Sequence, residues 1–176
     1  MTRNRSYKSL EKEVMSNKKY MLLNEESHHG LTRLEHSLRV SRNVYKVAKK
    51  LNLDYVSATR AALLHDFFFN EEFESNRGLI QGVVHPDIAL ANASGAFELN
   101  EIERNAIESH MFPLSVVVPK SKEAWVLTVV DKLVAIYEYG LYKWNPANLK
   151  GYLKYVSYTA SFLFILAINF ITMGEK

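Results

Sequence analysis

Apolar residues recur at helical spacing along most of this chain. Within residues 31–53, apolar side chains follow one another at steps of three or four and trace one face of a helix: Val40, Val44, Val47 and Leu51. Extending that face back by one turn reaches His36. The pattern predicts a long amphipathic helix with a histidine near its start.

Capping residues divide the next part of the chain into further helices. Asp54 is a favoured N-cap residue for an alanine-rich helix that leads into His65-Asp66. Asn100 suits the N-cap of a helix over 101–110, because acidic residues then fill the first turn, where the helix dipole favours them. Both segments are predicted to be helical, and each carries a histidine at its C-terminal end.

Glycine, asparagine and proline predict the remaining boundaries. Residues 67–82 contain several glycines and asparagines and are predicted to form a loop. Pro86 suits the first position of a helix over 87–97, since its missing N–H has no partner there in any case. A helix over 122–139 and a hydrophobic C-terminal helix over 146–173 complete the predicted set.

Strand-like alternation is confined to residues 115–118, so the predicted fold class is all-α, a bundle of helices. No internal repeat or low-complexity linker divides the chain. A chain of 176 residues suits one compact domain, and we expect a single domain over residues 1–176.

The absence of cysteine narrows the chemistry. With no cysteine and six histidines, disulfides, thiolate nucleophiles and cysteine-bound zinc are excluded, so any metal ion must be held by imidazole and carboxylate groups. The 22 Lys and Arg residues nearly balance the 19 Asp and Glu residues, for a net charge of +3. This weak positive charge favours anionic substrates but does not by itself indicate a nucleic-acid-binding protein.

The two ends of the chain differ in character. Residues 1–20 are polar and charged, unlike a secretory signal, so we expect a cytoplasmic protein. Residues 155–173 form a run of 19 uncharged residues, which would rise ~28 Å as a helix. The sequence leaves open whether this segment is a core helix, a homodimer interface or a membrane anchor that makes the protein membrane-associated.

Six residues on the predicted helices or next to their ends form an ordered set of candidate metal ligands. They are His36, His65, Asp66, His85, His110 and Asp131. Any one of these histidines would more often be a satisfied core residue, but buried imidazole and carboxylate groups are costly without partners, and neighbouring helices can bring such groups together around a cation. The set has enough ligands for one or two divalent ions.

The sequence around three of these positions resembles a known family. Glu35-His-Ser-Leu-Arg-Val40, Ala61-Ala-Leu-Leu-His-Asp-Phe67 and Val129-Val-Asp-Lys-Leu133 match, in order, the signature of the HD superfamily of metal-dependent phosphohydrolases. The resemblance spans residues 31–138. It implies an HD-type helical bundle with His36, His65, Asp66 and Asp131 as ligands of one metal ion.

The other two histidines resemble those of a two-metal subset of this family. Val84-His-Pro86 and Glu108-Ser-His-Met111 are similar to segments of bacterial symmetrical diadenosine tetraphosphate hydrolases, which use a di-iron centre. The chain departs from those enzymes at Met111-Phe-Pro113, where it looks closer to small HD proteins of low-GC bacteria. His85 and His110 would then complete a second ion, with Asp66 as the bridge.

The resemblance leads to a functional expectation. It implies one or two divalent ions (Fe or Mn, with Mg, Co and Zn as alternatives) and hydrolysis of a phosphoester or phosphoanhydride. Asp66 is the expected catalytic bridge, and Lys132 and Arg33 are expected to contact substrate phosphate during catalysis, or else to be solvated charges or partners of the ligands. The expected partner is a small phosphorylated molecule, a nucleotide, and not a nucleic-acid polymer. The alternative is a catalytically silent HD-fold protein that binds a nucleotide as a regulator.

Overall fold

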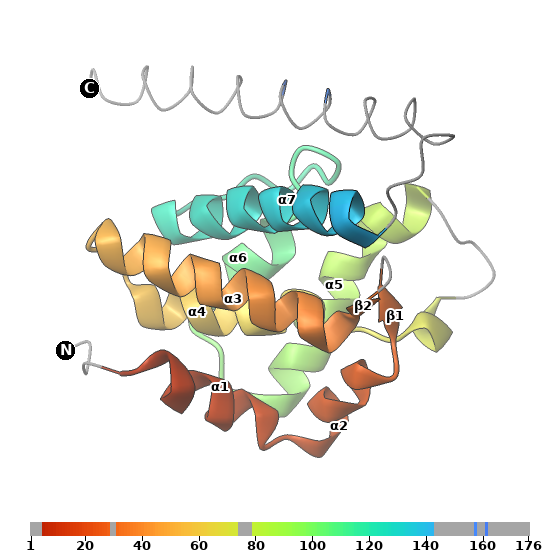
Figure 1. The fold of residues 1–176 in the computed structure, drawn as a ribbon, viewed down its shortest axis with the longest axis horizontal. Coiled ribbons are helices and arrows are strands. Elements are labelled where there is room, and N and C mark those ends of the chain that lie inside the picture. Colours follow the sequence, from red (N-terminus) through yellow and green to blue (C-terminus); the bar gives the residue numbers. More distant parts are fainter. Residues whose placement is uncertain (1–4, 29–30, 74–78, 143–156, 158–160, 162–176) are drawn as a thin grey trace.

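The protein is built from α-helices, as predicted (Figure 1). A computed structural model describes residues 5–28, 31–73, 79–142, 157 and 161 of the chain. The helices within these residues are α1 (Tyr7–Met15), α2 (Lys18–Met21), α3 (Arg33–Lys50), α4 (Tyr55–Leu64), α5 (Leu79–Ala96), α6 (Glu101–Ser109) and α7 (Lys122–Tyr142). Short 3₁₀ turns lie at Leu22–Asn24 and Asn70–Glu72.

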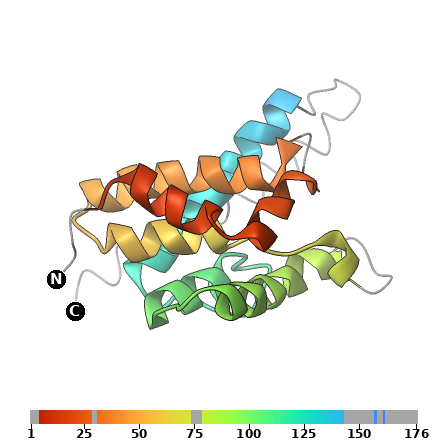
Figure 2. The same cartoon turned by 90° about the horizontal axis from the view of Figure 1, so that it is seen from below.

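Helix α4 lies at the centre of the bundle. It contacts α3 along one side and α6 along another, and it also contacts α1, α5 and α7. Figure 2 shows α4 between α3 and the pair formed by α5 and α6. Its buried side chains are small for most of its length, with Ala58, Ala61 and Ala62 fully buried. Small side chains let neighbouring helices approach α4 closely. Helices α3, α5, α6 and α7 all contact α4.

Two predicted N-cap residues are present, and α4 and α6 begin at the expected positions. The side chain of Asp54 accepts a hydrogen bond from the backbone N–H of Ser57 at the start of α4. Asn100 and Glu103 form a reciprocal capping box at the start of α6. These local interactions fix where each helix begins.

The buried face of α3 differs from the predicted stripe. Val40 and Val44 are fully buried, but Val47 is 37% exposed and Leu51 is 56% exposed, so the second half of the stripe was wrong. Ala48 occupies the inward position instead. The buried residues of α3 include small and polar side chains such as Ser37, Ser41 and Ala48, so apolar spacing alone did not identify the face that packs on the other helices.

Helix α5 begins earlier than predicted. It runs from Leu79 to Ala96, so Pro86 lies inside the helix and is not its first residue, and the predicted loop over 67–82 is shorter. Proline normally disfavours helical backbone in the residue before it. Here that residue is His85, which packs against α6 through His110, and this tertiary contact outweighs the local preference.

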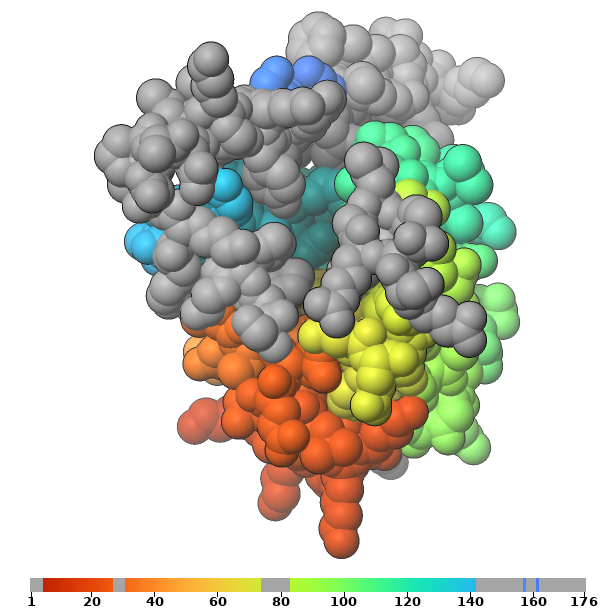
Figure 3. Space-filling view, turned by 90° about the vertical axis from the view of Figure 1, so that its right-hand side faces the viewer, coloured from red at the N-terminus to blue at the C-terminus, as the bar shows by residue number. Residues whose placement is uncertain are grey.

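The structure also corrects the strand prediction. Residues 115–118 form no strand, and instead β1 (Ser27–His28) and β2 (Leu31–Thr32) pair as a short antiparallel hairpin before α3. Two residues in each strand are too few to produce a visible alternation. On the face of the molecule shown in Figure 3, the orange N-terminal part of the chain lies beside the yellow part near residue 70.

The predicted C-terminal helix over 146–173 falls outside the described residues, apart from 157 and 161. The homodimer interface and the membrane anchor proposed for this segment therefore stay predictions. Among the described helices, none is both long enough and apolar enough to span a bilayer.

Candidate metal centre

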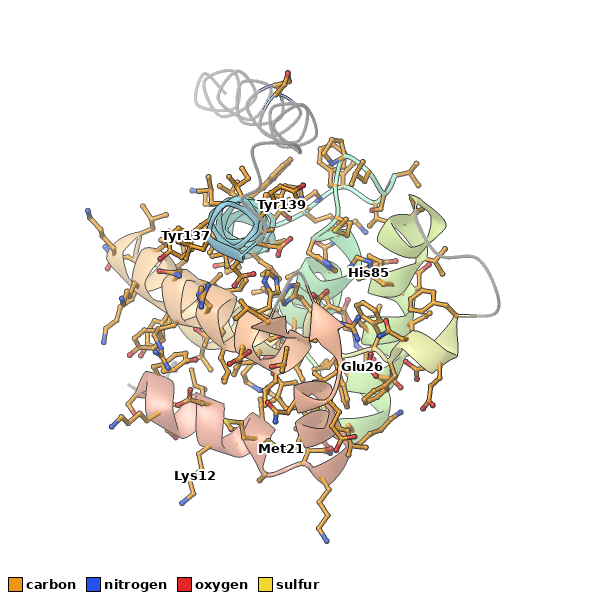
Figure 4. All side chains as sticks on the ribbon, turned by 45° about the vertical axis from the view of Figure 1, so that its right-hand side comes forward. Lys12, Met21, Glu26, His85, Tyr137 and Tyr139 are labelled. Atoms are coloured by element: carbon orange, nitrogen blue, oxygen red, sulfur yellow. The ribbon has the colours of Figure 1, made fainter. Side chains whose placement is uncertain are left out.

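Five helices bring the six candidate ligands to one place inside the bundle. His36 lies on α3, His85 on α5 and Asp131 on α7. His65 ends α4, with Asp66 directly after it, and His110 ends α6. All six residues are buried, none more than 7% exposed. Figure 4 shows His85 between α5 and α6.

The carboxylate of Asp66 lies between two pairs of histidines. Its Oδ1 is 3.3 Å from Nε2 of His85 and 3.7 Å from Nε2 of His110. Its Oδ2 is 3.7 Å from Nε2 of His65 and 3.9 Å from Nε2 of His36. Each oxygen of this one side chain therefore faces a different pair of imidazoles, which is the arrangement that a bridging carboxylate needs.

Asp131 adds a second carboxylate to one of the two pairs. Its Oδ1 lies 3.1 Å from Nε2 of His36 and 3.4 Å from Nε2 of His65. The ligand atoms of His36, His65 and Asp131 all lie within 4.8 Å of one another, and the same holds for His65, Asp66 and His110. Two overlapping groups of ligand atoms are thus present, each compact enough to surround a cation.

The outer ring nitrogens of three histidines have partners that fix the ring orientation. Nδ1 of His65 lies 2.9 Å from the carbonyl oxygen of Ala62, and Nδ1 of His110 lies 2.7 Å from that of Ile107. Nδ1 of His36 lies 2.7 Å from the carboxylate of Glu138. Because these acceptors require a proton on Nδ1, each Nε2 is left to bind a metal ion.

The residues present fit a divalent cation. The Nε2 atom of His65 is buried without a hydrogen-bond partner, and such an atom is costly to bury unless it has a ligand. Nε2 of His85 and Nε2 of His110 face each other at 2.9 Å, where a cation would satisfy both lone pairs. Imidazole and carboxylate donors suit hard or borderline divalent ions such as Mn²⁺, Fe²⁺ and Zn²⁺.

The electrostatics of the centre favour positive charge beside the carboxylates. Burial alone lowers the pKa of His36, but hydrogen bonds with Asp131 and Glu138 outweigh burial and raise it to about 10. Burial alone raises the pKa of Asp131, but His36 and His65 beside it hold that pKa well below its usual range. Burial and the neighbouring histidines lower the pKa of His110. A proton on His36 therefore competes with a metal ion for the same position.

Arg33 and Lys132, the two residues expected to bind substrate phosphate, differ in how deeply they are buried. Arg33 is only 2% exposed. Its guanidinium donates to Glu26 at 3.0 Å, to the carbonyl oxygen of Phe68 at 2.8 Å and to the side chain of Asn70 at 3.2 Å. Lys132 is half-buried and donates from Nζ to the carbonyl oxygen of His110 at 2.7 Å. The contacts of Arg33 are those of a residue that holds the segment after Asp66 in place.

The family model that matches this chain is the HD domain, over residues 33–136. The chain belongs to the HD domain family. This HD protein is also 33% identical over 107 residues to Ribonuclease Y from two strains of Ureaplasma parvum serovar 3. The match covers 61% of this chain but only 20% of each relative, so the chain corresponds to about a fifth of their length. No solved structure gave a significant match.

Membership in this family, in general a family of metal-dependent phosphohydrolases, agrees with the buried groups of metal-binding side chains. Sequence reasoning missed two residues of this HD protein that contact predicted site residues: Glu138, beside His36, and Glu26, beside Arg33. Glu138 lies seven residues after Asp131 on the same face of α7, so the helical spacing contained a signal for it. Glu26 carried no such signal, because the hairpin that brings it to Arg33 is too short to predict.

Proposed function

We propose that this HD protein is a phosphohydrolase that uses water to cleave a phosphoester or phosphoanhydride bond of a nucleotide or related small molecule. The observation that carries the proposal is the position of Asp66, whose two carboxylate oxygens each face a pair of histidine Nε2 atoms. A divalent cation held by these residues would supply a water nucleophile whose pKa is lowered from 15.7 to about 7, and would neutralise charge on the phosphoryl oxygens.

In this proposal the two halves of the centre have different histidine ligands and share the carboxylate of Asp66. His36, His65, Asp66 and Asp131 would hold the first ion. His85, His110 and Asp66 would hold the second. The hydrogen bonds at Nδ1 of His36, His65 and His110 keep these rings from turning, so the chain orients the nitrogen ligands before any ion arrives.

Two basic residues near the ligands, Lys132 and Arg33, have different roles in this proposal. Lys132 follows Asp131 directly, and burial lowers the pKa of its ammonium group. We assign Lys132 to the binding of substrate phosphate and to stabilising the His110 end of α6. Arg33 acts through the backbone that it holds at Phe68, two residues after the bridging carboxylate. Buried side chains around the centre exclude bulk water, which strengthens each charge–charge interaction there.

The similarity to Ribonuclease Y suggests RNA as a second candidate substrate. Ribonuclease Y is named for cleavage of RNA, which is also a phosphodiester. The aligned part is a fifth of that protein, and the cleavage of RNA by this chain is therefore the second candidate. Both substrates require hydrolysis of a P–O bond. They differ in the number of linked nucleotides that must enter the site.

The decisive experiment measures hydrolysis by protein stripped of metal and reloaded with Fe²⁺, Mn²⁺, Co²⁺, Zn²⁺ or Mg²⁺. The panel holds mononucleotides, nucleoside di- and triphosphates, dinucleoside polyphosphates and short oligoribonucleotides. We expect metal-dependent release of phosphate or nucleotide from a small substrate, with loss of activity in Asp66→Asn and retained activity in Glu103→Gln, which alters a buried carboxylate on α6 outside the centre. Activity on oligoribonucleotides alone would favour the second candidate. A metal-replete protein that hydrolyses none of them would overturn the proposal and favour the nucleotide-binding regulator.

A further inference from the structure

The imidazole of His36 lies between two carboxylates of the same helix. Asp131 and Glu138 are seven residues apart on α7, two turns along one face. The Nε2 atom of His36 is 3.1 Å from Asp131, and its Nδ1 atom is 2.7 Å from Glu138. Both ring nitrogens of this α3 histidine are therefore held by α7, one on the side of the centre and one on the far side.

Glu138 is completely buried and has a charged partner of its own. Its side chain is 0% exposed, and its Oε1 lies 3.1 Å from Nη1 of Arg39 on α3. The side chain of Arg39 is 30% exposed and also lies over the ring of Tyr137. Figure 4 shows Tyr137 on the side of α7 that faces α3. Arg39 thus compensates the charge of Glu138, which would otherwise be costly to bury.

We propose that Glu138 is a positioning residue of the metal centre, which fixes the ring of His36 so that Nε2 faces Asp131 and Asp66. A carboxylate on the outer nitrogen of a metal-binding histidine selects the tautomer, prevents rotation of the ring and increases the basicity of the ligand nitrogen. Glu138 lies outside residues 33–136, the part that matches the family model. The inference rests on the proposed function only in that it requires the centre to bind a metal.

The test titrates Co²⁺ into the metal-stripped full-length protein and records the visible d–d absorption bands, with no substrate present. We expect Glu138→Gln to weaken Co²⁺ binding about 10-fold and Glu138→Ala about 100-fold, because glutamine keeps an acceptor for Nδ1 while alanine keeps none. Glu103→Gln is the matched control, since Glu103 is also buried and paired with an arginine, Arg60, but lies away from the centre. Its Co²⁺ affinity should stay within about twofold of wild type, the usual scatter of an uncoupled site.

A second readout separates positioning from general stability. In Zn²⁺-loaded protein labelled with ¹⁵N-histidine, His36 should show a proton on Nδ1 in the wild type. This signal should shift in Glu138→Gln, where a neutral amide oxygen is the acceptor, and should broaden or disappear in Glu138→Ala. If Glu138→Ala does not fold, Glu138→Gln alone decides the matter. Wild-type affinity and an unchanged His36 spectrum in that variant would overturn this inference while leaving the proposed function intact. Failure of the wild type to bind Co²⁺ at all would overturn both.

Discussion

Nε2 of His85 and Nε2 of His110 face each other at 2.9 Å, although the two histidines lie on different helices. The Nδ1 atom of His110 is committed to the carbonyl oxygen of Ile107, which leaves the Nε2 lone pair directed at His85. Asp66 Oδ1 completes the group at 3.3 Å from His85. Two nitrogen donors and one carboxylate oxygen converge there, separate from the carboxylate of Asp131.

His85→Ala tests whether this half of the centre holds an ion of its own. We expect the metal content, measured by elemental analysis of metal-replete protein, to fall from two ions per chain to one. The remaining ion would keep His36, His65, Asp66 and Asp131 as ligands. An unchanged stoichiometry in the variant would show that His85 is not a ligand.

Asp66→Asn tests the bridging role of the central carboxylate. The amide has the same shape but no charge, so we expect the helical circular dichroism spectrum to persist while both ions are lost. Ligand-induced stabilisation should disappear with them, so a saturating metal ion that raises the melting temperature of the wild type should leave the variant unchanged. Full metal content in Asp66→Asn would contradict the assignment.

The stability of the metal-free protein should depend on pH in a defined direction. The pKa of His36 is raised from 6.5 to about 10 in the folded state, so its contribution is fully present below about pH 6.5 and is lost as the pH rises through about 10. His110 and Asp131 have lowered pKa values, so their contributions are lost on the acid side.

We therefore expect the melting temperature of chelator-treated protein to be highest near pH 6.5 and to fall toward pH 10. Metal binding should show the opposite trend over that range, because the ion displaces a proton from His36 and binds more tightly as the pH rises. A metal-free melting temperature that increases steadily from pH 7 to pH 10 would be inconsistent with a buried, protonated His36.

Arg33→Met tests the buried ion pair that holds the hairpin against the segment after Asp66. The substitution leaves Glu26 without its guanidinium partner, so we expect a loss of roughly 2–4 kcal/mol in the free energy of unfolding, measured by urea denaturation. Adding Glu26→Gln should restore part of this loss, since the uncompensated charge is then removed. A double variant no more stable than Arg33→Met would rule out the ion pair as the cause.

Val44→Ala and Val47→Ala compare the same substitution on two sides of α3. Val44 is fully buried, and its truncation should cost about 1–3 kcal/mol through lost burial and the cavity left behind. Val47 is 37% exposed, so the same change should stay within about 0.5 kcal/mol. Equal losses in the two variants would mean that α3 is buried on the predicted stripe after all.

The sequence predicted much of this arrangement because the decisive signals are local. Asp54 and Asn100 are side-chain caps that act within one helical turn, so the helices that they begin were placed correctly. The six candidate ligands were recognised from their order along the chain, and the fold brings all six together.

The errors arose where contacts distant in sequence decide the local structure. Pro86 lies within α5 because His85 packs on α6, and no pattern around residue 86 shows that contact. The side chain of Glu138 was missed although it shares a helical face with Asp131, because its partner His36 lies 102 residues away. The Glu26 contact depends on a two-residue hairpin that is too short to be predicted.

The two residues closest across the first half of the centre, His36 and Asp131, are separated by 95 positions in the chain. A cation bound between them would close a loop of that length, much as a covalent cross-link would, and its binding energy would add to the stability of the whole bundle. During synthesis, the chain could not assemble this half of the centre until α7 had left the ribosome and docked on α3. The ion of this half would therefore be acquired only after α7 has docked, and a truncated chain that ends before α7 would lack the Asp131 half of its binding site.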